Sequence, residues 1–416
     1  MKKLTIGILG LGVVGTGVLT ILAEQQEQLR QRGIDLTITK ALVRKAEDKT
    51  DLAKKYHIQL VHDAEEILTD PAIDIVVEVI GKIHPAKEFI TTALKNGKHV
   101  VTANKDLLAL HGEELSQLAQ QQDCFLYYEA SVAGGIPILR TLQNSYLADE
   151  ITEISGIING TTNYMLTQMK EKKLSYEESL SQAQQLGFAE SDPTNDVDGF
   201  DAAYKTILLT AFAFDMSLSF EELTIEGIRD IQKEDIRTAN RLGYEIKLIG
   251  RGQRIGDAVY AEVAPMWVPQ HHPLATIRNE FNGVFVKSRG IGSGMYYGPG
   301  AGARPTATSV VTDLATIAEN LQAGLPKLPF YGTLGPKKLA AADKVLSRYY
   351  LSFTLSTEEM PQLRQQLAAA KITGTEVLSP DDPTRFVLLT DPLTVTQVQS
   401  INVDANLDRR MKILEE

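Results

Sequence analysis

The first 135 residues alternate between short apolar runs and amphipathic stretches. Residues 4–9 are largely apolar, and similar runs lie at residues 36–43, 73–80 and 99–102. Runs of this length are typical of strands buried on both faces of a parallel sheet. Between them the apolar residues recur with a helical period, so the pattern predicts a doubly wound α/β domain over residues 1–135.

Further along the chain the pattern becomes less regular. Residues 151–158 alternate as a half-buried strand, and strand-like segments lie at 244–250, 258–264 and 284–288, with helical stretches between them. Strands and helices mixed in this way predict a second domain, over residues 136–305, built on a mixed α/β sheet.

The last part of the chain divides at a segment that contains proline and glycine. A helix over about 306–323 and this linker make residues 306–345 a connection that returns to the first domain. The order strand, helix, strand, strand, helix then predicts a small α+β appendage over residues 346–416.

A glycine fingerprint follows the first predicted strand and precedes a helix. Its residues are Gly10, Leu11, Gly12, Val13, Val14 and Gly15. In a dinucleotide site the first glycine allows a tight turn, the second lets the backbone approach a pyrophosphate, and the third permits close helix packing. The motif predicts a Rossmann-type domain, and the alternative is a glycine-rich turn in an unrelated α/β domain.

The second predicted strand ends in Arg44 and Lys45. An acidic residue at that point would bind the ribose 2′-hydroxyl of NAD, whereas an arginine can receive the 2′-phosphate of NADP. Asp35 lies at the opposite end of the strand. The sequence therefore favours NADP, with NAD as the alternative if these cations are only solvated.

Composition narrows the function classes. The chain has 416 residues and a net charge of −11 without a basic block, which argues against nucleic acid as a partner and leaves a small-molecule substrate. Its start lacks a signal-peptide pattern, and no apolar run approaches the roughly 20 residues of a membrane span. We expect a cytoplasmic protein without a membrane partner. The single cysteine, Cys124, excludes an intrachain disulfide framework.

Residues 190–205 concentrate charge ahead of an apolar helix. The stretch contains Glu190, Asp192, Asp196, Asp198, Asp201 and Lys205. Asp201 and Lys205 are spaced i and i+4, which places them on one helix face. This spacing also suits an ordinary surface ion pair, but a partly buried lysine beside carboxylates is a candidate for proton transfer.

Three further segments contain candidate ligands. Lys105 follows the strand at 99–102, at the edge where such sheets bind ligands, although a loop lysine can be simply solvated. Glu129 lies among glycines and backbone carbonyls, an oxygen-only setting that suits a hard cation, unless the backbone satisfies it. The polar turn at 159–163 can bind a substrate or cap a helix. The glycines at 290–294 and 298–302 form another candidate cofactor loop.

Taken in order, these motifs resemble homoserine dehydrogenase. The similar segments are residues 10–15, 101–105, 129–137, 156–163, 187–193 and 199–205. The resemblance covers roughly residues 4–345, and the appendage resembles the ACT domain of many family members. It implies the reversible, NAD(P)-linked interconversion of L-aspartate 4-semialdehyde and L-homoserine, on the pathway to threonine, isoleucine and methionine. It makes residues 136–305 a catalytic and dimerisation domain and implies a homodimer or homotetramer.

The resemblance also implies roles for individual residues. Lys205 is the expected proton donor to the aldehyde oxygen, with Asp201 and Asp196 near it. Lys105 is expected between nicotinamide and substrate. The remaining implied contacts are Glu190 and the Gly187 backbone at the amino-acid end of the substrate, Gly302 against the cofactor, and a sodium site of Glu129 with backbone oxygens of Val132, Gly134 and Ile136.

The chain departs from the family pattern at two places. Lys82 follows Gly81 where two glycines are frequent, and residues 356–361 lack the Asp and Pro-Gly of an ACT ligand loop, which argues against threonine feedback inhibition. Two alternatives remain. An aspartate-semialdehyde dehydrogenase would need Cys124 as a nucleophile, and a non-catalytic sensor would bind NAD(P) and an amino acid without turnover.

Overall fold

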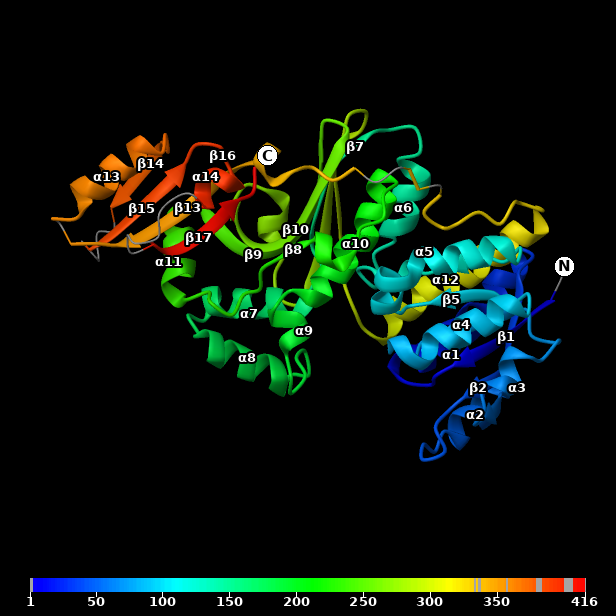
Figure 1. Cartoon of the computed structure of the whole chain (residues 1–416). Coiled ribbons are helices and arrows are strands. Elements are labelled where there is room, and N and C mark those ends of the chain that lie inside the picture. Colours follow the sequence, from blue (N-terminus) through cyan, green and yellow to red (C-terminus); the bar gives the residue numbers. More distant parts are fainter. Residues whose placement is uncertain are drawn as a thin grey trace.

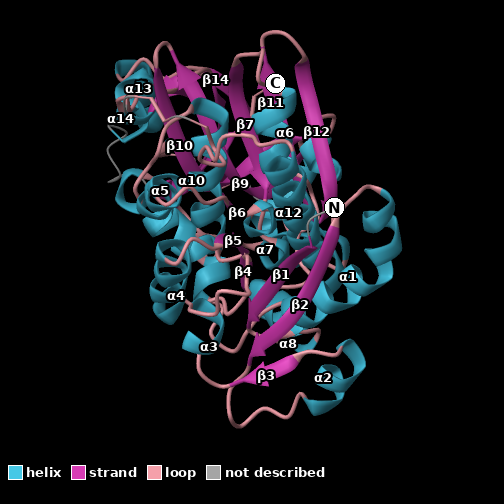
Figure 2. Cartoon of the chain, turned by 90° about the vertical axis from the view of Figure 1, so that its right-hand side faces the viewer, coloured by secondary structure: helices cyan, strands magenta, loops and turns pink. Residues whose placement is uncertain are grey.

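A computed structural model of the chain describes residues 3–332, 334–335, 338–356, 358–378, 384–399 and 407–415. The first domain (blue and cyan), the middle part (green) and the C-terminal part (orange and red) follow one another along a long axis (Figure 1). Turned by 90°, the strands of the first domain stand apart from those of the larger sheet (Figure 2). Among the described residues, no helix has the length and apolar character to span a bilayer.

The first domain is the doubly wound sheet that the apolar runs predicted. Its six parallel strands lie in the order β3-β2-β1-β4-β5-β6, which reverses between β1 and β4. β4 is buried along its whole length, as a strand covered by helices on both faces must be. The strands are β1 (Lys3–Leu9), β2 (Asp35–Leu42), β3 (Gln59–Val61), β4 (Ile75–Glu78), β5 (His99–Thr102) and β6 (Leu126–Tyr127). The helices are α1 (Val13–Gln31), α2 (Thr50–Tyr56), α3 (Glu65–Leu68), α4 (Ile83–Lys95) and α5 (Lys105–Gln121).

A helix from much later in the chain completes this domain. α12 (Ala303–Gln322), drawn in yellow, lies among the blue and cyan elements and packs on α1 (Figure 1). Gly17 makes the close approach of α1 and α12 feasible, because a Cβ on Gly17 would lie 2.5 Å from the carbonyl oxygen of Ala303. This packing brings a helix from late in the sequence into contact with the first helix of the chain.

The middle part contributes its strands to a large mixed sheet. Its strands are β7 (Ile151–Ile157), β8 (Thr224–Ile225), β9 (Tyr244–Ile255), β10 (Ala258–Pro269), β11 (Phe281–Ser288) and β12 (Gly292–Pro299). Its helices are α6 (Ile138–Ser145), α7 (Gly160–Glu171), α8 (Tyr176–Gln185), α9 (Thr194–Val197), α10 (Phe200–Phe214) and α11 (Lys233–Arg241). Short 3₁₀ helices are η1 (Glu129–Ser131), η2 (Phe220–Glu222), η3 (Pro273–Thr276) and η4 (Ala342–Lys344).

Two glycines of β9 allow α10 to pack closely against the sheet. A Cβ on Gly250 would lie 2.2 Å from Thr206 Oγ1, and a Cβ on Gly252 would lie 2.9 Å from the ring of Phe214. Because α10 packs this closely, almost every side of the helix after Lys205 is buried. The apolar sequence of residues 206–214 follows from this position.

One sequence interpretation was wrong. The glycines at 290–294 and 298–302 were read as a candidate cofactor loop, but β12 spans residues 292–299 of this segment and pairs antiparallel with β11. Glycine lowers β propensity, so the segment does not look like a strand by itself. Pairing with the neighbouring strand overrides that weak preference, and only Gly300 to Gly302 remain as the loop before α12.

The C-terminal part continues the same sheet. Its strands lie in the order β17-β13-β15-β14, and β17 pairs in parallel with β10 of the middle part. The indole of Trp267 in β10 also stacks on the ring of Tyr350, with centroids 4.0 Å apart. The elements are β13 (Leu346–Thr354), α13 (Met360–Ala369), β14 (Gly374–Leu378), β15 (Arg385–Thr390), β16 (Leu393–Thr394), α14 (Val395–Gln399) and β17 (Leu407–Ile413).

The order of these elements is βαβββαβ, and the last strand, β17, was not predicted by the sequence analysis. Parts of the predicted appendage lie outside the described residues. They are Thr357, in the loop that departs from the ACT pattern, Ser379 and residues 400–406. Also outside the described residues are Met1, Lys2, Thr333, Pro336 and Lys337, and residues 380–383 and 416.

Candidate active site

Two helices bring the two predicted lysines to one place. α5 begins at Lys105, directly after β5, and α10 begins after Gly199, whose φ of +86° is a conformation that favours glycine. Asp201 lies in the first turn of α10, one turn before Lys205. The packing of α5 against α10 then sets the lysine of the first domain opposite the carboxylate of the second.

The carboxylate of Asp201 is the centre of the site. Lys205 Nζ donates to Asp201 Oδ2 at 2.7 Å and to the carbonyl oxygen of Ile158 at 2.8 Å. Lys105 Nζ lies 3.2 Å from Asp201 Oδ1 and 3.0 Å from the carboxylate of Asp106. Asp201 is 9% exposed, so this is a buried pairing and not the surface ion pair that the spacing alone allowed.

The charges of the site support one another. Burial by itself would raise the pKa of Asp201, but the two neighbouring ammonium groups outweigh it and lower the pKa to about 2. Burial would likewise lower the pKa of Lys105, and the attraction of Asp201 and Asp106 reverses that effect and raises it. The aspartate therefore stays ionised and Lys105 stays protonated at neutral pH.

The polar turn before α7 joins the same cluster. Asn159 caps α7 and donates to Asp196 at 2.7 Å and to Asp201 at 2.8 Å. Burial raises the pKa of Asp196, and the Asn159 donor opposes that rise. The sequence offered substrate binding or helix capping for this turn, and it missed the bridge to Asp196 and Asp201 because the partners lie 37 and 42 residues away.

Two predicted substrate residues lie apart from this cluster. Glu190 is exposed, and Gly187, with a φ of +77°, ends the turn after α8. Thr161 donates to the carbonyl oxygen of Phe188 at 2.6 Å, which ties their loop to the start of α7. The loop is thus adjacent to the site, and the backbone carbonyl oxygen of Glu190 accepts from the side chain of Gln184 at 3.0 Å.

The glycine loop has the shape that its sequence predicted. Gly10 has a φ of +105°, and a Cβ on Gly15 would lie 2.1 Å from the Gly10 carbonyl oxygen. A Cβ on Gly12 would meet nothing within 4 Å, and Val13 is 70% exposed although it is apolar. Leu11 is buried and Val14 is partly buried. An open backbone at a helix N-terminus fits the pyrophosphate of a dinucleotide.

Two other predicted cofactor residues are exposed. Gly302 has a φ of +121° and precedes α12. Arg44 lies just beyond β2, and its guanidinium Nε donates to Glu47 at 2.6 Å. The carboxylate of Glu47 therefore competes with any phosphate for this arginine.

The sequence analysis missed a buried carboxylate at the edge of the first sheet. Glu78, at the end of β4, accepts from Thr102 Oγ1 at 2.6 Å and from the backbone N–H of Ile80 at 2.7 Å. Burial raises its pKa. Asn104, which caps α5, donates to the Lys82 carbonyl oxygen at 2.9 Å. Together these bonds shape the loop after β4 beside Lys105, and a polar residue inside an apolar run was the signal for Glu78.

The predicted cation ligand Glu129 has protein partners. Its two carboxylate oxygens accept the backbone N–H groups of Leu139 and Arg140, each at 2.8 Å. Of the three carbonyls expected with it, that of Gly134 accepts from Ser309 and that of Ile136 from Ile138. Among the described residues, no three His, Cys, Asp or Glu side chains gather to hold a metal. The observed bonds match the alternative that the sequence left open, a turn with Glu129 satisfied by backbone.

The thiol of Cys124 does not suit nucleophilic chemistry. It is buried, and burial raises its pKa to about 11. Because the thiolate is the reactive form, this environment argues against the thioester chemistry of the aspartate-semialdehyde dehydrogenase alternative.

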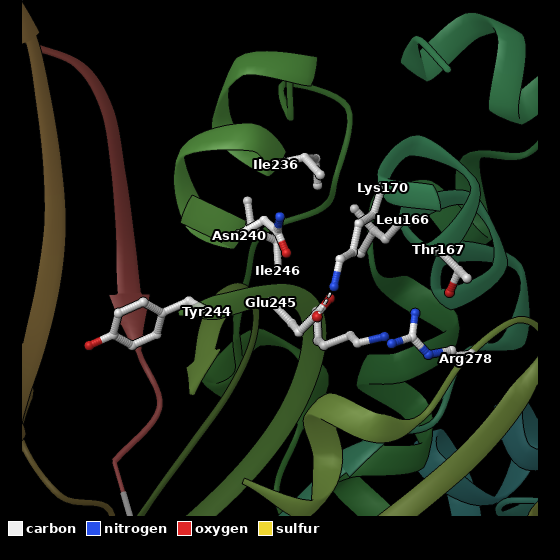
Figure 3. A pocket seen from close by; sticks show the side chains of 10 residues that line it. Leu166, Thr167, Lys170, Ile236, Asn240, Tyr244, Glu245, Ile246 and Arg278 are labelled. Carbon is white, nitrogen blue, oxygen red and sulfur yellow. Dashed lines mark hydrogen bonds and ion pairs between the residues drawn. The ribbon is translucent and has the colours of Figure 1, made fainter. Parts of the chain in front are cut away.

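A small pocket near the C-terminal end of α7 is separate from the lysine cluster. It measures about 10 Å³, which is room for about one water. Lys170 points at Glu245 across it, and Arg278 lies beside them (Figure 3). Lys247, which also lines it, donates to Asn163 and to the Ile277 carbonyl oxygen, and burial lowers its pKa to about 8. These charged groups are paired, so the pocket has a structural character.

Comparison with known proteins agrees with this geometry. The family model of homoserine dehydrogenase matches residues 137–315, and the model of the homoserine dehydrogenase NAD-binding domain matches residues 10–129. A homoserine dehydrogenase of Lactococcus lactis is 44% identical over 97% of this chain and 95% of its own length. The chain belongs to the homoserine dehydrogenase family.

Further homoserine dehydrogenases extend the agreement. That of Bacillus subtilis is 45% identical over 86% of this chain and 83% of its own length. The crystal structure of the one from Thiobacillus denitrificans superposes with a TM-score of 0.93 at 35% identity, covering 100% of this chain and 99% of the other. A hyperthermophilic archaeal homoserine dehydrogenase mutant in complex with NADPH has a TM-score of 0.66 at 26% identity, covering 79% of this chain and 100% of its own. The protein is thus an oxidoreductase of this family with a nicotinamide nucleotide cofactor.

Proposed function

We propose that this member of the homoserine dehydrogenase family interconverts L-aspartate 4-semialdehyde and L-homoserine, with Lys205 as the proton donor and Lys105 beside the reacting carbon. The observation that carries this proposal is the convergence of Lys105 and Lys205 on the buried Asp201, where α5 leaves the carboxyl edge of the first sheet. The bound nicotinamide supplies the hydride. The protein supplies positive charge where the aldehyde oxygen becomes negative.

The proton path uses side chains that are already in place. In the reduction direction the ammonium of Lys205 gives a proton to the developing alkoxide, and Asp201 keeps that lysine oriented. In the oxidation direction the same lysine must be neutral to take the alcohol proton. Glu190 and the Gly187 backbone are proposed to bind the amino-acid end of the substrate, on the loop that Thr161 anchors.

The cofactor preference is proposed to be NADP, with NAD as the second cofactor. Arg44 supports NADP because its guanidinium is exposed just beyond the end of β2, and an arginine after this strand can receive a 2′-phosphate. We also propose that Gly302 contacts the cofactor, since its exposed loop precedes α12, which packs on α1 next to the glycine loop.

Several features stay predictions, some from the sequence pattern and some from the family resemblance. They are the sodium ion at Glu129, the assembly into dimers or tetramers, the cytoplasmic location, the domain boundaries and the ACT character of residues 346–416. For sodium, the hydrogen bonds that Glu129 and two of the carbonyls already make leave only their remaining lone pairs for a cation, and no step of the mechanism depends on it.

The test is steady-state oxidation of L-homoserine with NADP⁺ and then NAD⁺, for the wild type, Lys205→Ala and Lys172→Ala. Lys172 is an exposed lysine at the end of α7 and provides a matched control. We expect turnover in the wild type and the control, none in Lys205→Ala, and unchanged cofactor binding in all three. Cofactor binding without turnover in the wild type would overturn the proposal and favour the sensor alternative.

A further inference from the structure

Asn159 lies between β7 and α7 and contacts α10, the helix of Asp201 and Lys205. It is 5% exposed, and its backbone is still extended, with φ −119° and ψ 113°, as expected of a residue that caps a helix. The preceding residue, Ile158, provides the carbonyl that accepts from Lys205. The backbone here therefore already contacts the proposed proton donor.

The orientation of the Asn159 amide follows from its own partners. Its Oδ1 accepts both the backbone N–H and the hydroxyl of Thr162, each at 2.8 Å. An amide nitrogen cannot accept these bonds, so the oxygen must face α7 and the nitrogen must face the opposite way. The NH₂ group is thereby aimed at the carboxylates.

Both hydrogens of that NH₂ group are used on two different aspartates. Nδ2 donates to Asp196 Oδ1 at 2.7 Å and to Asp201 Oδ2 at 2.8 Å. The second acceptor is the oxygen that also accepts from Lys205. One neutral side chain thus joins a carboxylate on α9 to the carboxylate that orients the lysine on α10.

We propose that Asn159 is a positioning residue of the reaction: its amide holds Asp196 and Asp201 as a fixed pair and so sets the direction in which Lys205 points. This inference rests on the proposed role of Lys205. A cap alone needs only an acceptor oxygen, which serine and aspartate also provide. The bridge needs two donors on one atom, which among small polar side chains only an amide supplies.

Asp196 and Asp201 carry like charges close together, and the hydrogen bond from Asn159 stabilises the charged form of Asp196. Asp196 faces the like charge of Asp201 and the ammonium of Lys205, and the nearby hydroxyl of Thr161 gives its hydrogen to the Phe188 carbonyl oxygen. Without the Asn159 donor, burial and the like charge favour a protonated Asp196, which then competes with Lys205 for Asp201. Loss of the bridge should therefore appear as a shift of the acidic limb of the pH–rate profile to higher pH.

The experiment compares Asn159→Ser and Asn159→Asp with the wild type. Both variants keep an acceptor for the α7 cap, and neither has the donors for the bridge. Ser175→Ala removes the side-chain cap of α8 instead and controls for cap loss. The measurements are kcat/KM for homoserine from pH 5.5 to 9.5, the Kd of the cofactor and the thermal unfolding temperature.

We expect both Asn159 variants to lose about 10²-fold in kcat/KM, the scale of a misplaced catalytic group. Their acidic limb should move to higher pH, Asn159→Asp more than Asn159→Ser, with an unchanged cofactor Kd. Wild-type kcat/KM and pH profile in Asn159→Ser would overturn the inference, as would a loss that tracks only the unfolding temperature, as in Ser175→Ala. A wild type without turnover would instead overturn the proposed function.

Discussion

Two buried aspartates in this protein each contact two cations, and their surroundings give them different properties. Asp201 on α10 is bracketed by Lys105 and Lys205. Asp235 on α11 lies 3.2 Å from Arg385 of β15 and 3.4 Å from Arg409 of β17. Lys105 and Lys205 join the first domain to the middle part through Asp201. Arg385 and Arg409 join the C-terminal part to the middle part through Asp235.

The difference lies in the kind of cation that surrounds each aspartate. A lysine can release its proton, whereas arginine stays charged in proteins and forms rigid, directional bonds. Burial raises the pKa of Asp235 despite its two arginines, while the two ammonium groups lower that of Asp201. The same arrangement of charges thus fits the proposed proton transfer at Asp201, and at Asp235 it fits a contact between the middle and C-terminal parts, where the sheet also continues from β10 to β17.

The largest effect should come from exchanging the kind of cation. Lys205→Arg keeps the charge beside Asp201 but removes a group that can give and take a proton, so kcat should fall by roughly 10²–10⁴-fold. Arg385→Lys makes the reciprocal change at Asp235 and should leave kcat near the wild-type value. Steady-state kinetics and cofactor titration measure both, and a Lys205→Arg enzyme with more than a tenth of wild-type kcat would contradict the assignment.

Asp235 should contribute to the stability of the fold and not to catalysis. Asp235→Ala leaves two arginines partly buried without their carboxylate, and breaking a buried pair typically costs about 3–5 kcal/mol. Urea unfolding should show this loss, while kcat per folded enzyme stays unchanged. Asp201→Ala is the matched variant, because it should abolish turnover. If Asp235→Ala lowers the free energy of unfolding by less than about 1 kcal/mol, the contact between the C-terminal and middle parts does not depend on Asp235.

Acid should act on the two aspartates with opposite sign. Asp201 has a folded pKa of about 2 against an ordinary 3.8, so it contributes about 2 kcal/mol that is present above pH 4 and lost toward pH 2. The pKa of Asp235 is raised, so acid protonates it more readily in the folded state and favours folding there. Unfolding free energies between pH 2 and 6 should therefore fall less steeply in Asp201→Asn and more steeply in Asp235→Asn than in the wild type.

The rate of homoserine oxidation should depend on the protonation state of the lysines beside Asp201. The lysine that takes the alcohol proton must first be neutral. Burial would lower the pKa of the neighbouring Lys105, but Asp201 and Asp106 outweigh burial and raise it, so neutral Lys105 is scarce near pH 7. We expect homoserine oxidation to climb toward alkaline pH by up to about tenfold per pH unit. The pH profile of kcat between 6 and 10 measures this, and a maximum near pH 6 is the outcome that the lysine mechanism excludes.

The smallest effect is expected at a third, exposed ion pair. Arg44 and Glu47 contact each other in solvent, and such pairs contribute only about 0–1 kcal/mol to stability. Arg44→Ala should therefore leave the unfolding free energy unchanged and weaken NADP⁺ binding about threefold to tenfold, with NAD⁺ little affected. Equal losses for both cofactors in equilibrium titrations would remove the argument for an NADP preference.

Some features could be predicted from the chain because their signals are local. The apolar runs and the Gly10 to Gly15 loop predicted the first sheet, because buried parallel strands and tight turns impose their own residue types. The i to i+4 spacing of Asp201 and Lys205 likewise depends only on helix geometry. The strand β12 could not be read because its glycines have a low β propensity, and the last strand, β17, could not be read because its partners β10 and β13 lie far away in the sequence.

The sequence by itself determined which side chains can transfer a proton and which segment can approach a pyrophosphate, because those properties belong to residue types and local turns. Only the tertiary structure decided that Lys105 meets Asp201 across 96 residues, that Asn159 joins two aspartates, and that Glu129 accepts backbone N–H groups of α6. Burial and charge pairing depend on what the rest of the chain brings near, and they set the pKa of each group.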